Sequence, residues 1–353
     1  MKEINFNELK QESIVLYLKE SIRSSFNNEE FNWEFKSLNG NVVFKLYTDN
    51  EHIVASQAML PIKLLVNNKV TETAKSETSF LNQLYRGHNH FEKLYFSTIE
   101  ASQKNGVQLI WGFTPAVKVW KKKLNFDIVT NNISEATITL SKYPSNLFLK
   151  KYVSNKIKCV FKILIFSFLR LFEKKVNYPI TKTDVQVSTV FPKEEVLQDF
   201  QKELSRKFNI NVYLKFNNEY INWRIKTNPL LKYQSCFFYQ ESNLVGYIIF
   251  SIKDERLSIA DISYLETNTA SHMLNYILSQ YSKNINSVFY FGNDDSEFGE
   301  NVFNIFEKFN AKIVKSNWAN TVIKDVSFDN KYKDVLDPTT WLINGLWTEG
   351  FSI

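Results

Sequence analysis

The chain has 353 residues, of which 44% are hydrophobic and 15% aromatic, and its formal net charge is +6. This length exceeds the usual single-domain range and the composition excludes a disordered chain, so we expect two folded domains with ample core. Two cysteines and four scattered histidines provide neither a disulfide framework nor a zinc site, so we expect no metal.

Positive charge is concentrated in one segment. Residues 150–175 contain eight Lys or Arg and one acid, Glu173, a local balance of +7 that exceeds the net charge of the whole chain. A nucleic-acid binder would spread such charge over a domain surface, so we expect no nucleic-acid partner. Residues 1–5 contain no basic stretch leading into an apolar core, so we expect no signal peptide and a cytoplasmic protein.

The N-terminal part predicts a helix followed by antiparallel strands. Residues 1 to about 30 are amphipathic, with one apolar side formed by Ile14, Val15, Leu18 and Ile22. Residues 42–47 and 52–59 predict strands joined by a polar turn, and residues 62–66 and 70–73 predict a second hairpin. These strands lead into residues 77–129, around which the chain is organised.

Residues 77–129 predict the order strand, glycine-containing turn, helix, strand, helix. The run 77–81 is apolar and β-branched, as in a strand. The next apolar residues recur at helical spacing, namely Phe91, Leu94, Tyr95, Thr98 and Ile99. Gly106 stands where glycine commonly follows a helix, residues 107–113 predict a buried strand, and residues 117–124 predict a second helix.

The turn itself, YRGHNHF at residues 85–91, has the features of an anion site. The first turn of a helix carries unpaired backbone N–H groups, and the helix dipole adds partial positive charge. Gly87 permits close approach of a ligand and Arg86 adds a cation, which together suit a phosphate or pyrophosphate. On these residues alone, an ordinary strand-to-helix turn with a surface arginine is an equal alternative.

With its surroundings, the turn resembles the pyrophosphate loop of the GNAT acyltransferase superfamily. One branch of that family has Tyr-Arg-Gly-x-Gly-x-Phe in this loop, and the closing helix ends Lys-Leu-Gly-Phe. This chain has KLNF at residues 123–126, so Asn89 and Asn125 stand where the family has glycine. Asparagine tolerates left-handed backbone better than most residues, so we expect the fold to survive. Lys121 replaces a tyrosine that protonates the leaving thiolate in many members, and we expect it on a solvated basic helix face.

The resemblance implies an enzyme that transfers an acyl group from acetyl-CoA, or another acyl-CoA, to an amine. The residues that it assigns to the cofactor are Leu81, Asn82, Gln83, Leu84, Arg86, Gly87, His88, Asn89, His90 and Phe91. Glu77 is the only carboxylate on the preceding strand, which makes it the candidate catalytic base; the alternative is an exposed strand residue. The acceptor would be a small-molecule amine, with an amino sugar or an amino acid among the candidates.

Residues 142–180 predict a helical connector. Its apolar face contains Ile157, Val160, Phe161, Leu164, Phe168, Leu171 and Phe172, while Lys158 and Lys162 lie elsewhere. The longest uncharged run, residues 163–169, is far too short to cross a bilayer. We favour a helix packed between domains, and a helix that lies on an anionic membrane surface through residues 157–172 stays open.

The rest of the chain repeats the first part. Residues 31–36 match 221–226 and residues 123–129 match 308–314, at offsets of 190 and 185. Two matches at nearly one offset predict a duplicated unit. The NWR element at residues 222–224, followed by Asn228 and Pro229, looks like the second half of double GNAT proteins of bacteria. The second copy has no Arg-Gly in its turn, residues 264–270, so we expect no CoA there.

The predicted fold class is therefore α+β, with two tandem GNAT-like domains that each have a mixed, largely antiparallel sheet flanked by helices. The predicted divisions are residues 1–141, the connector 142–180, and residues 181–353 with an aromatic tail. Trp341, Trp347 and Glu349 in that tail predict packing over the second domain, or the wall of an acceptor pocket. A catalytically degenerate scaffold protein is the alternative function, and the oligomeric state stays open.

Overall fold

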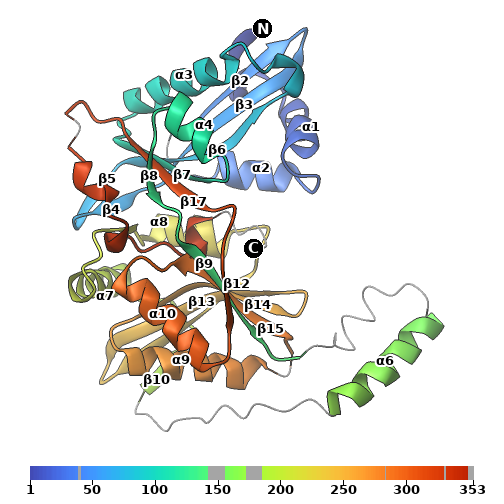
Figure 1. Ribbon diagram of the computed structural model, residues 1–353, viewed down its shortest axis with the longest axis vertical. Coiled ribbons are helices and arrows are strands. Elements are labelled where there is room, and N and C mark those ends of the chain that lie inside the picture. Colours follow the sequence, from blue (N-terminus) through green and yellow to red (C-terminus); the bar gives the residue numbers. More distant parts are fainter. Residues whose placement is uncertain (39–40, 142–155, 172–184, 283, 330, 349–353) are drawn as a thin grey trace. The chain divides into compact units, whose positions relative to one another are not determined.

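The computed structural model describes residues 1–38, 41–141, 156–171, 185–282, 284–329 and 331–348 (Figure 1). The chain forms two compact units. Unit 1 contains Met1–Asn132, Asn211–Leu230 and Asn317–Trp341, and unit 2 contains Ile133–Ile210, Leu231–Ser316 and Leu342–Ile353. The boundaries predicted near residues 141 and 181 follow the two sequence repeats, whereas the compact units exchange segments between the two halves of the chain.

Unit 1 is built on a seven-stranded sheet. Its strands, in spatial order, are β1 (Lys2–Asn5), β2 (Val43–Asp49), β3 (His52–Pro61), β6 (Thr73–Leu81), β7 (Leu109–Thr114), β17 (Asn320–Asp325) and β8 (Asp127–Thr130). Neighbouring strands are antiparallel except β6 and β7, which are parallel. Figure 1 shows β17 between β7 and β8, although β17 lies far from both in the sequence.

Helices cover both faces of this sheet. One face carries α1 (Gln11–Ser21) and α2 (Asn28–Phe35), and the other carries α3 (His90–Lys104) and α4 (Val117–Lys123) (Figure 1). The stripe predicted for α3 is confirmed, because Leu94, Tyr95, Thr98 and Ile99 are all buried. Gly106 follows α3 with φ +87°, a left-handed conformation that favours glycine.

Unit 1 also contains a small sheet and a short helix from the middle of the chain. The small sheet has the order β11 (Val212–Leu214), β4 (Leu64–Val66), β5 (Lys69–Thr71). Helix α8 (Asn218–Ile221) continues as one π-helical stretch, Asn222–Lys226. The indole rings of Trp33 and Trp223 stack at 5.2 Å, and each Nε1–H donates to the other residue's carbonyl oxygen, at 2.8 and 2.9 Å.

Unit 2 has a sheet with the same plan. Its order is β10 (Val185–Ser188), β12 (Tyr233–Gln240), β13 (Asn243–Lys253), β14 (Arg256–Tyr264), β15 (Ser287–Asn293), β9 (Ile133–Thr139) and β16 (Lys312–Lys315). Only β14 and β15 are parallel, as β6 and β7 are in unit 1. Its helices include α7 (Glu194–Lys207), α9 (Thr267–Tyr281) and α10 (Glu297–Lys308).

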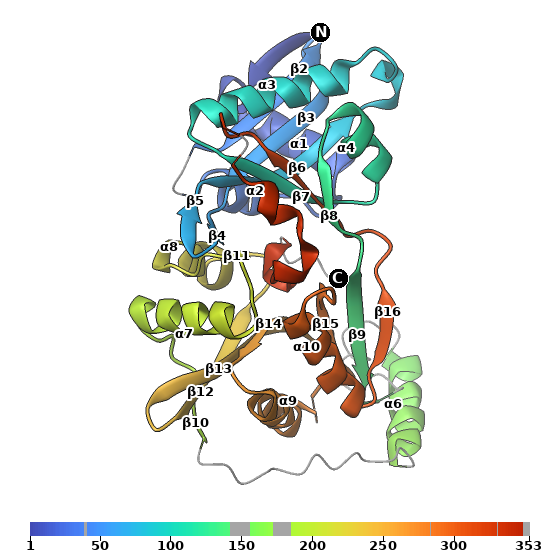
Figure 2. The same ribbon diagram turned by 60° about the vertical axis from the view of Figure 1, so that its left-hand side comes forward.

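The two copies of the repeat exchange their last strands. Strand β9 follows β8 in the sequence but lies between β15 and β16, where Figure 2 shows it as a green arrow. Strand β17 correspondingly joins β7 and β8. The repeated KLNF and KFNA segments both contain a left-handed asparagine, Asn125 with φ 56° and Asn310 with φ 58°. The tandem α+β fold predicted from the sequence is therefore confirmed.

Two details of the N-terminal prediction are wrong. Residues 2–5 form β1 rather than helix, because Ile4 is buried against β2 in an antiparallel pairing. In α1, Ile14 and Leu18 are buried as predicted, but Ile22 lies beyond the helix end and is 41% exposed.

Helix α6 (Lys156–Leu171) is the described part of the connector; residues 142–155 and 172–180 of that prediction lie outside the described residues. Within the described ranges, every helix is too short or too polar to cross a membrane. Four large apolar side chains of α6 are exposed to solvent, those of Val160, Phe161, Leu164 and Ile165.

Candidate functional site

The predicted anion-binding turn lies between β6 and α3 in unit 1. After β6 ends at Leu81, residues 83–85 form one 3-10 turn, and α3 begins at His90. Gly87 has φ +95° and Asn89 has φ 54°, so the asparagine adopts the left-handed conformation expected of it. The Asn89 side chain makes no capping hydrogen bond to α3. The Glu92 carboxylate bonds its own backbone N–H, so a ligand at this end would meet the N–H groups of His90 and Phe91.

Contacts outside the turn fix its shape. The Tyr85 hydroxyl donates to Asp49 Oδ2 at 2.8 Å, and the Asn82 side chain accepts from the Leu84 N–H at 3.0 Å. Arg86 Nε donates weakly to the Leu81 carbonyl at 3.4 Å. Among the described residues, no atom lies within 4 Å of a Cβ placed on Gly87, so the backbone there is open to approach.

The ten residues predicted for the cofactor all lie between Leu81 and Phe91, but they differ in exposure. Most of them face solvent: Gln83, Leu84, Arg86, Gly87, His88 and Asn89 are exposed, and Asn82 and His90 are partly so. Leu81 and Phe91 instead pack into hydrophobic clusters with Leu94 of α3. Their side chains hold the ends of the turn, and only their backbones are placed to meet a ligand.

Strands β6 and β7 part at Lys75, and β6 continues from there to the start of the turn at Leu81. Their pairing comprises only Thr73–Leu109, Ala74–Ile110 and Lys75–Trp111, beyond which β6 has no strand partner on that side among the described residues. At the parting, β6 bulges against β3, and Thr78 adopts φ 49°. A β-branched residue rarely adopts this conformation, and such strain is typical of functional sites.

The strained Thr78 is also buried and incompletely hydrogen-bonded. Its carbonyl accepts from Ser56 Oγ at 2.6 Å, while its own hydroxyl has no hydrogen-bond partner among the described residues. Ser56 in turn accepts from the Tyr17 hydroxyl at 3.1 Å. The bulge therefore holds a polar strand edge open at the point where the sheet divides.

A hydrogen-bonded network lines the α3 side of this opening. The Tyr95 hydroxyl and Gln57 Nε2 both donate to Ser76 Oγ at 2.9 Å, and Ser79 Oγ donates to Gln57 Oε1 at 2.6 Å. Burial raises the pKa of Tyr95 well above its ordinary value, so the phenol stays protonated. Sequence reasoning placed Tyr95 in the helix stripe and missed this contact.

The other side of the opening contains buried charges. Glu77, the predicted base, forms an ion pair with Lys75, whose Nζ lies 2.5 Å from Glu77 Oε1, and the Glu77 side chain is 18% exposed. Lys75 is buried over the rings of Trp111 and Phe113, and burial lowers its pKa despite the Glu77 carboxylate. The alternative of an exposed strand residue therefore does not describe Glu77.

Glu34 on α2 joins this cluster. Burial, and secondarily the Glu77 carboxylate, raises the pKa of Glu34 to about 8, so it is largely protonated at neutral pH. Arg224, whose guanidinium lies 6.0 Å from the Trp33 ring, is buried beside the same cluster. Sequence reasoning assigned no role to the charges of Glu34, Lys75 and Arg224. Glu34 and Arg224 lie in the repeated segments 31–36 and 221–226, whereas nothing in the sequence around Lys75 marked it as buried.

Two further predictions concern residues outside the opening. Lys121 on α4 is exposed, in line with the solvated basic helix face expected of it. Trp341 and Trp347 are buried, and Trp341 Nε1 donates to the Val335 carbonyl at 2.7 Å, so both serve packing rather than a pocket wall. Glu349 lies outside the described residues.

Comparison with known proteins gives matches in structure alone. No protein-family model and no curated protein matches the sequence. A probable N-acyltransferase from Enterococcus faecalis is 12% identical, with a TM-score of 0.65 over 93% of this chain and 73% of that one. A GCN5-related N-acetyltransferase from Anabaena variabilis is 15% identical, with a TM-score of 0.61 over 93% and 74%.

The Saccharomyces cerevisiae N-myristoyltransferase, solved with bound myristoyl-CoA, is 12% identical, with a TM-score of 0.54 over 92% of this chain and 78% of that one. Identities this low identify a fold and not a substrate. The matches extend over both units and agree with the repeated strand order of the two sheets. The chain is thus built from two tandem copies of the GNAT fold.

Proposed function

We propose that the protein is an acyl-CoA-dependent N-acyltransferase whose acyl-CoA site lies in unit 1. The observation that carries this proposal is the parting of β6 from β7, after which β6 leads into an exposed turn with an arginine, an open glycine and an uncapped helix N-terminus. These groups suit a pyrophosphate, and the free edge of β6 suits an extended chain such as pantetheine. Acetyl-CoA is the first cofactor to test, and the fold match to an N-myristoyltransferase supports including a long-chain acyl-CoA.

The acceptor in this proposal is a small-molecule amine, such as an amino sugar or an amino acid, that approaches Glu77. The amine nitrogen attacks the thioester carbonyl, a C–N bond forms and the C–S bond breaks. Glu77 accepts the proton that the amine loses, and the departing sulfur takes a proton from water. A backbone N–H of the bulged β6 segment stabilises the negative charge on the carbonyl oxygen. Lys75 keeps Glu77 in place through their ion pair.

Calorimetric titration with acetyl-CoA and with myristoyl-CoA tests the site. We expect saturable binding of at least one of them, weakened by about tenfold or more in Arg86→Ala through the loss of a charge-assisted contact. Gly87→Glu should abolish binding, because it places a carboxylate where the pyrophosphate would lie. Gly106→Glu is the matched control, since Gly106 has a similar φ and equally open surroundings at the opposite end of α3.

The control for the arginine substitution is Arg206→Ala, on the exposed face of α7. Both controls should bind like the wild type. If the wild type binds neither acyl-CoA, or if Arg86→Ala and Gly87→Glu bind as tightly as the controls, the proposed site is refuted. The alternative of a non-catalytic GNAT-fold binding protein would then be favoured.

A further inference from the structure

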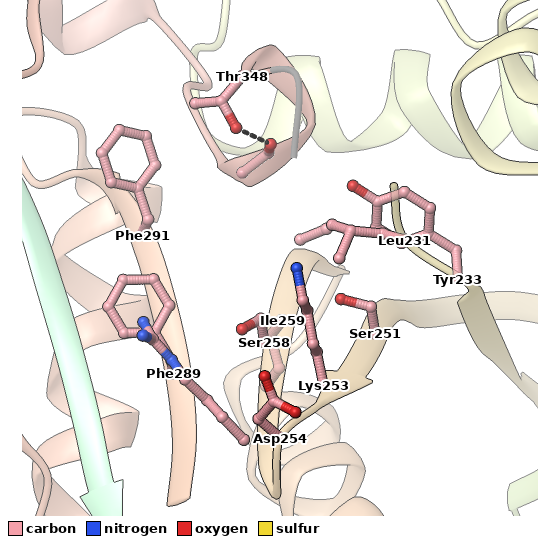
Figure 3. A pocket seen from close by; sticks show the side chains of 13 residues that line it. Leu231, Tyr233, Ser251, Lys253, Asp254, Ser258, Ile259, Phe289, Phe291 and Thr348 are labelled. Atoms are coloured by element: carbon pink, nitrogen blue, oxygen red, sulfur yellow. Dashed lines mark hydrogen bonds between the residues drawn. The ribbon is translucent and has the colours of Figure 1, made fainter. Parts of the chain in front are cut away.

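Unit 2 contains a cavity of about 340 Å³ that lies outside the proposed acyl-CoA site. It is formed by one face of the sheet at β13, β14 and β15, and by two short segments beside it. Figure 3 shows side chains of its lining, among them Leu231, Tyr233, Ser251, Lys253, Ser258 and Phe291. Cavities of this size accept small organic molecules.

The cavity lies on the sheet face away from α10. Phe289 and Phe291 alternate along β15 and line the cavity, whereas Tyr290 between them is buried and stacks on Phe306 of α10 at 5.3 Å. Arg256 and Ser258 likewise alternate along β14. These four lining side chains therefore belong to two regular strands, which hold them more rigidly than loops would.

A comparison with unit 1 explains why this space is open. The first parallel pairs are Thr73–Leu109 in unit 1 and Arg256–Ser287 in unit 2, so counting along the strands makes Ser258 the counterpart of Lys75. In unit 1, the Lys75 side chain fills this face and lies over the rings of Trp111 and Phe113. In unit 2 a serine replaces it, and the removed side-chain volume becomes cavity.

The chemistry of the lining defines a ligand class. Among the lining residues, Lys253 and Arg256 contribute two cations and Asp254 one carboxylate, and the Glu135 carboxylate lies near enough to Arg256 to raise its pKa. Lys253 points its ammonium group into the cavity (Figure 3). The Arg256 guanidinium lies 3.8 Å from the centre of the Phe289 ring. Burial lowers the pKa of Arg256, but arginine stays charged in proteins. Lys253 is exposed and Arg256 is partly buried. A ligand carboxylate would form charge-assisted hydrogen bonds with these two cations.

The walls of the cavity are aromatic or aliphatic. The apolar walls are formed by Tyr233, Phe289, Phe291 and Leu231. The hydroxyls of Ser251 and Ser258 face the same space (Figure 3). We infer that unit 2 has a second small-molecule site, which binds an organic anion with an apolar or aromatic body. This inference does not depend on the proposed acyl-CoA site, because all lining residues belong to unit 2.

The test uses 4-phenylbutyrate as the probe and the neutral 4-phenylbutanol as its matched control, both titrated into the full chain. We expect the acid to bind about tenfold or more tightly than the alcohol, the effect of one charge-assisted contact. Lys253→Met and Arg256→Met should each remove that preference, since methionine keeps an apolar stem without the charge. Ser258→Leu should abolish binding of both probes by filling the cavity.

Lys312→Met is the control variant, because Lys312 is an exposed lysine on β16 of the same unit. It should bind like the wild type. Titration should also shift the NMR signals of the Leu231 methyl groups, which places the probe in this cavity rather than near Arg86. Equal affinity for the two probes, binding unchanged in all three lining variants, or no binding of the acid at millimolar concentration would each overturn the inference.

Discussion

The protonation of Glu34 predicts a pH-dependent stability that one substitution should remove. Folding raises the pKa of Glu34 from its ordinary 4.5 to about 8, chiefly through burial. Between these values the folded protein holds the proton and the unfolded chain releases it. Stability from this group is therefore fully present below about pH 4.5 and is lost progressively as the pH rises to about 8.

The size of the effect follows from the linkage relation. Each pH unit inside this window changes the free energy of unfolding by about 1.4 kcal/mol, so the interval from about pH 5.5 to 7.5 corresponds to about 3 kcal/mol. Glu34→Gln keeps the shape of the protonated side chain and does not ionise. The variant should gain stability relative to the wild type by about this amount as the pH rises across the interval.

Urea unfolding at several pH values, monitored by tryptophan fluorescence, measures this difference. Glu29→Gln on the exposed side of α2 is the matched control and should follow the wild type at every pH. A difference between the wild type and Glu34→Gln that stays constant from about pH 5.5 to 7.5 would refute the reasoning, because Glu34 would then ionise alike in the folded and unfolded states.

Three further outcomes are expected. Glu77→Gln should lower kcat by about 100-fold with acyl-CoA affinity unchanged in steady-state and binding assays, and an unaltered kcat would remove Glu77 from the reaction. Trp33→Phe and Trp223→Phe should each lower the free energy of unfolding by about 1 to 3 kcal/mol. The double variant should lower it by less than the sum of the two, because the two indoles share one reciprocal contact. Strictly additive losses in urea titrations would contradict this. The exposed apolar side of α6 predicts binding to anionic vesicles, and both salt and the double substitution Lys158→Gln, Lys162→Gln should weaken it. If the protein does not cosediment with the vesicles, or if neither change weakens its cosedimentation, the packed connector is favoured.

The elements that local patterns specify were predictable. The spacing of Leu94, Tyr95 and Ile99 fixed α3, and Arg86 with Gly87 marked the turn before it, because both signals lie within a few residues. The repeat offset of 190 likewise paired Trp33 with Trp223. It did not indicate that these two indoles contact each other, which depends on how distant segments fold together.

Features that depend on long-range pairing were missed. No sequence pattern near residues 320–325 indicates that this strand inserts between β7 and β8, which lie about two hundred residues earlier in the chain. The cavity was missed for a similar reason: Ser258 is an ordinary strand residue, and its effect appears only beside Phe289 of the neighbouring strand. Glu34 was missed because burial, and not its sequence neighbours, sets its protonation.

The exchange of β9 and β17 has a consequence for biosynthesis. The ribosome makes the chain from its N-terminus, so β7 and β8 are complete long before β17, which fills the place between them. During that interval each of the two strands has an unpaired edge, and unpaired edges readily join other chains. Unit 1 can close only when residues 320–325 have been made, so a nascent chain that stops earlier carries an open sheet and needs protection from aggregation.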